Sequence, residues 1–338
     1  NSGNPVVPAL LLFLAASPTF EESFRAGLTA LQRNDLTAAA ENLETASKLA
    51  PENGRVWVAL SQAYWKRQES GKAEAAAGKA ASLAPEDAAV QQSLAIYYSE
   101  TGQKLKAARA QAKYASKAAQ AAEARDRAGA LYFEAAQPLL EKQNFADAIA
   151  VLREAHTQVP NQAQIELALG VACYGLRRFD EAADAFLRTI AIDPEIEQPY
   201  VFLGKFLDQI PSRLPDVTAK FVDYEAKHPE SYTGPLLHAK ALDAQSIEPE
   251  TSRKLLEKAL AMNDRDASAH FELGTVLDRL QKFDEAAHEF ERAIALDASD
   301  PAAHYRLARD YDRLGKHDAA QAERERHAKL VKAQDAVR

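Results

Sequence analysis

Residues 267–300 read ASAHFELGTVLDRLQKFDEAAHEFERAIALDASD. The stretch holds two segments with apolar residues at helical spacing, one around Leu273 and Leu277 and one around Phe283, Ala286 and Phe290. A mostly polar break, residues 278–282, separates the two segments. The pattern predicts two amphipathic helices joined by a turn. Because a lone helix pair of this size cannot bury its apolar faces, it requires neighbours of the same kind.

The same pattern recurs along the chain with a period of 34 or 35 residues. A Pro, a short polar residue or an Ala follows the last apolar position of each repeat, and these end markers are Pro51, Pro85, Pro160, Pro194, Pro229, Asp264 and Ala298. One interval, from Pro85 to Pro160, is 75 residues long, which is two periods and seven residues more. We expect the Ala-rich run over residues 105–127 to take up the extra residues as an elongated second helix. The markers divide residues 20–338 into about nine repeats.

Small and large apolar residues alternate at fixed places in these repeats. Gly170 and Gly274 stand in the middle of first helices, and Ala286 stands in a second helix. Phe186 and Phe290 follow later in second helices, where a large side chain can fill the wedge between two helices. This alternation predicts close helix contacts along the whole array.

The chain resembles the tetratricopeptide repeat family. The residues that carry the resemblance are Gly170, Ala182, Phe186 and Pro194 in one repeat, and Trp57, Leu60, Tyr64, Ala73, Ala80 and Pro85 in another. The resemblance implies an all-α fold, a right-handed superhelical α-solenoid of about nine helix-turn-helix repeats over residues 20–338. It also implies a concave groove lined by the first helix of every repeat. Two places depart from the usual short turn, residues 210–215 and 246–249, and Pro138 lies inside a first helix.

Composition excludes several classes of function. The 338 residues carry a formal net charge of −8, so there is no basic field to hold a nucleic acid. The single cysteine, Cys173, excludes an intramolecular disulfide and a CxxC metal knuckle, and its apolar neighbours indicate a packed core thiol. We find no catalytic constellation and no requirement for a cofactor.

Residues 1–19 form an apolar segment that differs from the rest. Residues 9–16 are uncharged and apolar, and they are too few for a membrane span. The segment is either the remnant of a signal sequence or a helical cap or groove-filling segment. If residues 5–17 are a signal remnant, we expect an exported or periplasmic protein, and otherwise a cytoplasmic one.

His270 and His304 occupy the same place in consecutive repeats. Stacked on neighbouring helices, the two rings could bind a metal, and a metal-dependent enzyme is therefore one alternative. No third ligand is spaced with them, so we interpret both as packing residues in the column that also holds Trp57 and Tyr132.

The expected groove is lined by residues spaced four and then three apart on each first helix. Its N-terminal half is apolar and aromatic, and its C-terminal half adds a recurring Asp and a Lys or Arg. The candidate partner-binding residues are Phe24, Trp65, Ile96, Phe133, Tyr174, Lys205, Lys240, Phe271, Tyr305 and Arg309. As an alternative, Lys205 with Asp208, Lys240 with Asp243, and Arg309 with Asp312 could pair within their own helices.

We therefore predict a non-catalytic scaffold that binds a peptide or another protein in its groove. The family also contains repeats that clamp a C-terminal carboxylate with Lys and Asn, or hold a peptide backbone with an Asn ladder. Neither mode transfers, because no Asn lies on the expected inner stripe. Three arginines, Arg306, Arg309 and Arg313, are left as candidates for a carboxylate. A further alternative is self-assembly, in which the apolar N-terminal segment fills its own groove or that of a second copy.

Overall fold

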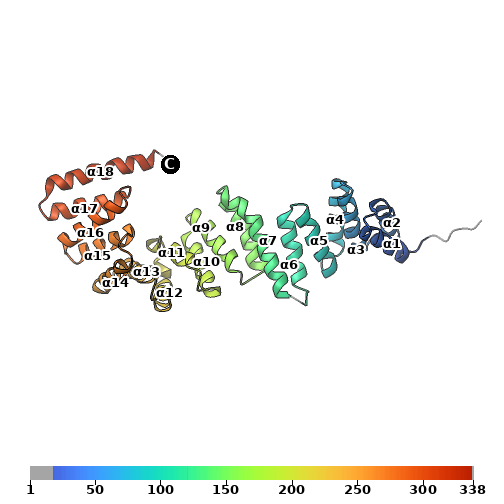
Figure 1. Cartoon of the computed structure of the whole chain (residues 1–338), viewed down its shortest axis with the longest axis horizontal. Coiled ribbons are helices and arrows are strands. Elements are labelled where there is room, and N and C mark those ends of the chain that lie inside the picture. Colours follow the sequence, from blue (N-terminus) through green and yellow to red (C-terminus); the bar gives the residue numbers. More distant parts are fainter. Residues whose placement is uncertain (1–17, 120, 337–338) are drawn as a thin grey trace, which may run out of the picture. The chain divides into compact units, whose positions relative to one another are not determined.

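A computed structural model describes residues 18–119 and 121–336. Over these residues it contains 18 α-helices, two short 3-10 helices and no strand (Figure 1). The expected all-α architecture of helix-turn-helix repeats is confirmed. Residues 1–17, where we expect a signal remnant or a groove-filling segment, lie outside the described residues. The chain divides into two compact units, Asn1–Ala135 and Ala136–Arg338, which we call unit 1 and unit 2.

The described helices form nine successive pairs, each a first and a second helix. They are α1 (Phe20–Gln32) with α2 (Leu36–Leu49), α3 (Gly54–Lys66) with α4 (Ser70–Leu83), α5 (Ala88–Glu100) with α6 (Lys104–Ala115), α7 (Ala121–Glu141) with α8 (Phe145–Gln158), α9 (Ala163–Gly175) with α10 (Phe179–Ile192), α11 (Gln198–Leu203) with α12 (Leu214–Lys227), α13 (Thr233–Ala244) with α14 (Pro249–Met262), α15 (Ala267–Arg279) with α16 (Phe283–Leu296), and α17 (Pro301–Arg313) with α18 (His317–Asp335).

Side chains just before the first helices fix where these helices begin. Asn53, Asp87, Asp266 and Asp300 each accept a hydrogen bond from a backbone N–H in the first turn of the following helix. Such a bond satisfies one of the helix N–H groups that have no partner within the helix. The short polar residues in the turns between repeats therefore act as helix caps.

Most of the turns within the helix pairs share one backbone feature. A residue with positive φ stands two positions before the second helix, as at Gln68, Arg177 and Gln281, with φ between 58° and 64°. This left-handed conformation ends the first helix. Among the described residues, the glycines with positive φ are Gly102 and Gly315, and glycine adopts this conformation without strain. The other turns accept a small local cost because the packing of the two helices over-determines them.

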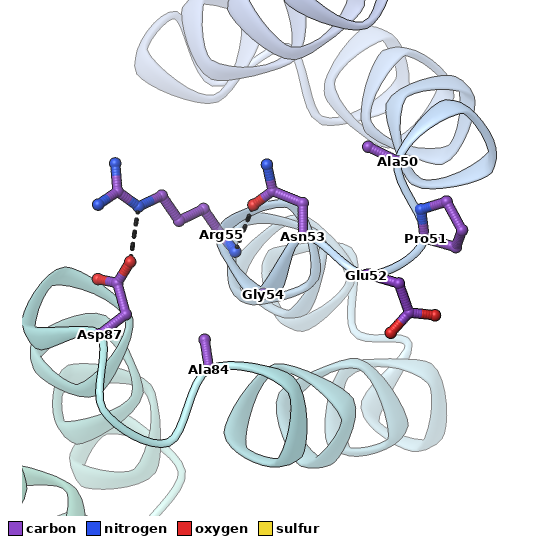
Figure 2. A pocket seen from close by; sticks show the side chains of 8 residues that line it. All are labelled: Ala50, Pro51, Glu52, Asn53, Gly54, Arg55, Ala84 and Asp87. Atoms are coloured by element: carbon purple, nitrogen blue, oxygen red, sulfur yellow. Dashed lines mark hydrogen bonds and ion pairs between the residues drawn. The ribbon is translucent and has the colours of Figure 1, made fainter.

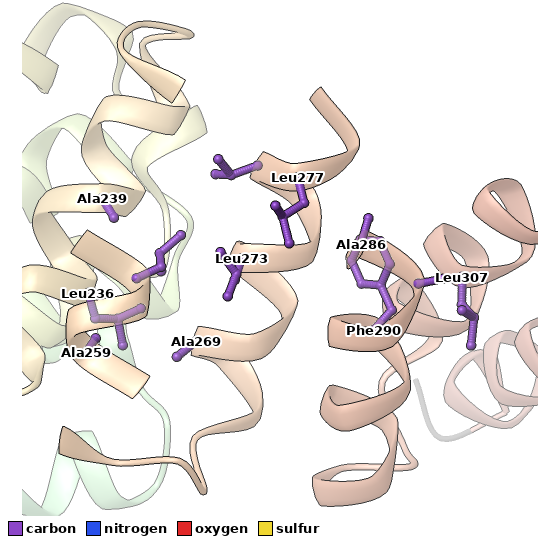
Figure 3. Packing of buried hydrophobic residues seen from close by; sticks show 12 residues of the cluster. Leu236, Ala239, Ala259, Ala269, Leu273, Leu277, Ala286, Phe290 and Leu307 are labelled. Carbon is purple, nitrogen blue, oxygen red and sulfur yellow. The ribbon is translucent and has the colours of Figure 1, made fainter. Parts of the chain in front are cut away.

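The core lies between the helices of each pair and between neighbouring pairs. In unit 2, buried side chains from α13 to α17 form one cluster, which includes Leu236, Leu273, Phe290 and Leu307 (Figure 3). Phe290 fits against Gly274, where a Cβ atom would lie 2.8 Å from the Phe290 ring. The predicted alternation of small and large residues is thus confirmed at this contact.

The extra seven residues do not lengthen a second helix, so that prediction is wrong. Helix α6 ends at Ala115, and the added length lies in the next first helix, α7, which has 21 residues. A continuous helix would place Glu123 and Asp126 on the buried face, where their charges would lack water. Instead, the buried positions of α7 begin with Ala124 and Ala128. These positions are out of phase with the buried positions of α6, so the chain turns between the two helices.

The sixth repeat departs from the others, as the sequence indicated. Its first helix, α11, has only six residues and is followed by two 3-10 turns, Leu207–Gln209 and Pro211–Arg213. Phe206 and Ile210, which lie beside and between these turns, are buried, so the irregular backbone is held by packing.

Candidate functional site

The first helices lie side by side within each unit. In unit 1, α1 contacts α3 and α3 contacts α5; in unit 2, α13 contacts α15 and α15 contacts α17. Among the described residues, no two successive second helices make comparable contacts. The first helices are therefore closer together and lie on the inner side of each stack. In each unit, we call the surface that carries the predicted stripe on these helices the first-helix face of that unit.

In unit 1 the most exposed of the predicted site residues is Ile96 on α5. Its side chain is 44% exposed, which is unusual for an isoleucine in a packed array. Ile96 lines a cavity of about 150 Å³ together with Gln92, Tyr114 and Arg127. The cavity lies where α7 begins after the turn that the sequence did not predict.

The other predicted aromatic residues of unit 1 are half-buried. Phe24 stacks on Phe20 with ring centroids 5.6 Å apart, and Trp65 contacts the edge of Tyr97 at 6.4 Å. Phe133 on α7 is also half-buried. These rings contribute to packing within the unit as well as to the first-helix face.

In unit 2, Tyr174 is part of an aromatic cluster. Its ring lies 5.4 to 6.0 Å from the rings of Phe179, Phe202 and Phe206, which come from α10, α11 and the irregular segment after it. Tyr174 therefore joins the fifth and sixth repeats and is only partly available to a partner.

The last two predicted aromatic residues differ in exposure. Phe271 on α15 packs on Phe290 with ring centroids 5.7 Å apart. Tyr305 on α17 is 47% exposed and has Arg309 beside its ring, at 5.9 Å. Among the described residues of unit 2, Tyr305 is consequently the most exposed large apolar side chain on this face.

The charged residues of the seventh repeat pair with the next first helix. Lys240 on α13 pairs with Glu272 on α15 at 3.1 Å, and Asp243 on α13 pairs with Arg279 on α15 at 3.0 Å. The alternative in which Lys240 and Asp243 satisfy each other within one helix is therefore wrong. Lys240 and Asp243 pair with α15 and not with each other because the adjacent first helices bring opposite charges of two repeats together.

In the ninth repeat, Asp312 also pairs outside its own helix, with Arg324 on the second helix α18 at 2.5 Å, and not with Arg309. Within the described residues, Arg309 and Lys205 have no ion pair, and Asp208 has none either. The first-helix face of unit 2 thus keeps two unpaired cations beside carboxylates that are mostly neutralised.

A cavity of about 340 Å³ opens on this face where α11 is short. Its charged lining residues are Lys205, Asp208, Lys240, Asp243 and Glu272. Burial raises the pKa of the Asp243 carboxyl, the Arg279 guanidinium opposes this shift, and the negative charge of Glu272 adds to it. The cavity holds charges of both signs and therefore does not by itself select the charge of a ligand.

His270 and His304 are buried and engaged at both ring nitrogens. Nδ1 of His270 lies 2.6 Å from Glu289, and Nδ1 of His304 lies 2.5 Å from Glu323. Nε2 of each ring faces the carbonyl oxygen six residues before it, at 3.1 Å and 3.4 Å respectively. The interpretation of both as packing residues is confirmed, and neither has a nitrogen left for a metal.

The same column ties first helices to the turns before them elsewhere. Trp57 donates its Nε1–H to the carbonyl of Pro51 at 2.7 Å, and Tyr200 donates its hydroxyl to the carbonyl of Pro194 at 3.1 Å. Trp, Tyr and His thus perform one structural role, which is to satisfy a turn carbonyl at the start of a first helix.

Reactive groups are scarce in the described part of the chain. No three His, Cys, Asp or Glu side chains among its residues are arranged to hold a metal ion. Cys173 is buried, as expected, and burial raises the pKa of its thiol, which disfavours the reactive thiolate. None of the described helices combines the length and the apolar character needed to cross a bilayer.

A larger cavity, of about 500 Å³, lies at the start of the first helix α3, in unit 1 (Figure 2). It is formed by two turns between repeats and is open to solvent. Arg55 pairs with Asp87 at 3.0 Å across it, and Asn53 caps α3. Since these polar groups satisfy one another, the cavity offers no convergent groups for a ligand.

Sequence reasoning missed a carboxyl pair between α15 and α17. Asp278 and Asp310 both contact Arg313, and Arg306 lies 3.7 Å from Asp278. The sequence contains only a weak signal for the cluster, two arginines of α17, Arg306 and Arg313, that stand seven residues apart. Asp310 lies outside the stripe from which the candidate residues were taken.

Comparisons with known proteins place this arrangement in a family. Two family models, both described as tetratricopeptide repeat, match the chain, one over residues 133–195, 236–301 and 272–327 and the other over residues 30–97. No curated protein sequence matches the chain at a significant level.

Several solved structures are similar in fold. MamA from Desulfovibrio magneticus RS-1 is 20% identical over 51% of this chain and 96% of its own, with a TM-score of 0.43. PilW, a type IV pilus biogenesis factor, is 18% identical over 58% of this chain and 90% of its own, with a TM-score of 0.49. Yeast Tom70 is 16% identical over 92% of this chain and 85% of its own, with a TM-score of 0.45. The chain belongs to the tetratricopeptide repeat family, whose helical repeats serve as scaffolds for protein interaction.

Proposed function

We propose that the protein is a non-catalytic scaffold that binds an extended or helical segment of a partner protein on the first-helix face. One observation carries the proposal. The first-helix face of unit 1 exposes the apolar side chain of Ile96. That of unit 2 exposes Tyr305 and the unpaired cations Lys205 and Arg309, while Asp243 and Glu272 beside Lys240 are already paired. A partner can therefore add contacts there without breaking existing ones.

The energetics favour a segment with several anchors over a small ligand. Burying one large apolar side chain contributes about 1.5–3 kcal/mol. A dissociation constant of about 1 μM corresponds to about −8 kcal/mol, and the cost of association must be met as well. Two or more apolar anchors and a few charged contacts are consequently needed. Trp65, Phe133, Tyr174, Lys240 and Phe271 stay predicted contacts, although each also packs or pairs within the protein.

Photo-crosslinking tests which face the partner occupies. A photoreactive phenylalanine analogue at position 96 is compared with one at position 49, because Leu49 on the second helix α2 of the same unit is 50% exposed. In extract of the cells that make the protein, we expect a discrete adduct from position 96 and none from position 49. Equal adducts at both positions, or an adduct at 49 alone, would contradict the proposal.

Charge variants test the contribution of the unpaired cations. We expect Lys205→Ala with Arg309→Ala to weaken binding of the crosslinked partner about tenfold, because exposed charge contacts contribute up to about 1 kcal/mol each. Stability should change by less than about 0.5 kcal/mol, since neither side chain has an ion pair to lose among the described residues. Lys254→Ala on α14, an exposed lysine of a second helix, is the matched control and should leave affinity unchanged. Titration calorimetry measures affinity, and unchanged affinity in the double variant would remove the electrostatic part of the proposal.

A further inference from the structure

The contact between α15 and α17 contains two carboxyl groups that share one guanidinium. Nη1 of Arg313 lies 3.0 Å from Oδ1 of Asp310 and also contacts Asp278 of the preceding first helix. Arg306, two turns earlier on α17, lies 3.7 Å from Asp278. Two carboxylates and two guanidiniums therefore meet at the edge of the first-helix face.

One oxygen of this cluster has no donor among the described residues. Asp310 has no exposed surface, and its Oδ2 is buried without a hydrogen-bond partner. The polar group that faces it is the Asp278 carboxyl, which as a carboxylate can only accept. A buried acceptor without a donor costs about 1–3 kcal/mol. A proton on either carboxyl would turn this repulsive contact into a hydrogen bond.

The charged groups that α16 and α18 bring near the cluster are paired with other residues. On the α16 side, Lys282 pairs with Glu285 at 3.3 Å, and the Phe283 ring packs against Arg313 at 4.6 Å. On α18, the nearby charged side chains also have partners within their own contacts: Arg324 pairs with Asp312, and Glu323 with His304. The described elements packed here thus leave no donor for the Asp310 oxygen.

We propose that Asp278 and Asp310 form a proton-binding site which strengthens the contact between α15 and α17 when the pH falls below neutrality. Uptake of one proton leaves Arg306 and Arg313 with a single carboxylate, so the first-helix face gains one positive charge near Arg309. The contact between the last two repeats and the charge of their inner surface are thereby linked to pH.

The direction of the pH effect follows from the geometry. Burial and the neighbouring Asp278 charge raise the pKa of Asp310 to about 6, from an ordinary value of 3.8. The folded protein therefore holds a proton that the unfolded chain releases between pH 6 and pH 4. Stability from this group rises as the pH falls from 7 toward 4, and it is absent above pH 7.

Hydrogen exchange measured by mass spectrometry on the full chain tests the proposal. Exchange of α15 and α17 amides, corrected for the intrinsic pH dependence of exchange, is compared at pH 5 and pH 7. Because pH also acts on the rest of the protein, the measurement is the ratio between wild type and Asp310→Asn. We expect the slowing from pH 7 to pH 5 to be about tenfold greater in wild type, because a proton bound with a pKa near 6 stabilises the fold by about that factor at pH 5.

Two further measurements keep the proposal testable if that variant folds poorly. Asp278→Asn removes the facing carboxylate and should reduce the same pH dependence. Carbon-13 NMR of the side-chain carboxyls in the wild-type protein should show Asp310 titrating with a pKa of about 6. Equal pH dependence in wild type and both variants, or titration of Asp310 at its ordinary pKa of 3.8, would overturn the proposal. None of these measurements requires a partner, so they are independent of the proposed binding function.

Discussion

Replacing Phe290 by alanine should lower the free energy of unfolding by about 3–5 kcal/mol, the usual cost of removing a fully buried phenylalanine. Phe290 has no exposed surface and fills the space beside Gly274, between α15 and α16. Its ring also contacts Phe271 at 5.7 Å. Removal leaves a cavity that the two helices cannot close, because their backbones already approach closely at Gly274.

Urea unfolding followed by circular dichroism measures this loss, and hydrogen exchange locates it. Leu296→Ala in the same helix is the matched control, because Leu296 is 41% exposed. The control should cost less than about 1 kcal/mol. Since repeat proteins unfold by neighbouring units, the loss of protection in Phe290→Ala should concentrate in α15 to α17. Equal losses in the two variants would mean that Phe290 is not a central contact of unit 2.

The same substitution, glycine to alanine, should have opposite effects at two positions. At Gly170 a Cβ atom would lie 2.5 Å from the Phe186 ring, which is itself fully buried. We expect Gly170→Ala to destabilise the protein by about 1–3 kcal/mol, as overpacking of a closed contact does. At Gly78, in α4, nothing among the described residues lies within 4 Å of the added atom, so Gly78→Ala should stabilise by about 0.5–1 kcal/mol through better helix propensity.

The pair of variants separates packing from backbone preference. Both glycines are helical, so propensity alone would predict that both substitutions stabilise. Denaturant midpoints measured under the same conditions decide between the two explanations. If Gly170→Ala is as stable as wild type, the close approach of α9 and α10 must be able to relax, and the small residue there serves another purpose.

The helix pairs could be predicted because their signals are local. The Pro and Asp residues of the turns, and the matched Gly274 and Phe290, recur at the repeat period and need no knowledge of the rest of the fold. The turn between α6 and α7 could not be placed, because residues 116–120 contain no Gly or Pro to mark it. Only the change of phase of the buried face, seen at Ala124 and Ala128, requires the chain to reverse there.

The candidate site was less predictable because its charged side chains form ion pairs with residues of other helices. Lys240 and Asp243 stand three residues apart, which favours a local pair, yet each pairs with α15. That choice depends on the register of adjacent helices and not on spacing along the chain. The same register brings Asp310 against Asp278, so a carboxyl pair arises from two residues that nothing in the sequence sets apart.

Substantial helix contacts within the described residues join only close neighbours along the chain. This has a consequence for how the protein is made. A hairpin that leaves the ribosome finds its packing partner within about one repeat of newly synthesised chain, so the array can grow repeat by repeat while synthesis continues. At any moment the nascent chain then exposes little more than the apolar side of its most recent helix. Chaperone demand during synthesis should accordingly depend on the length of one repeat and not on the length of the protein.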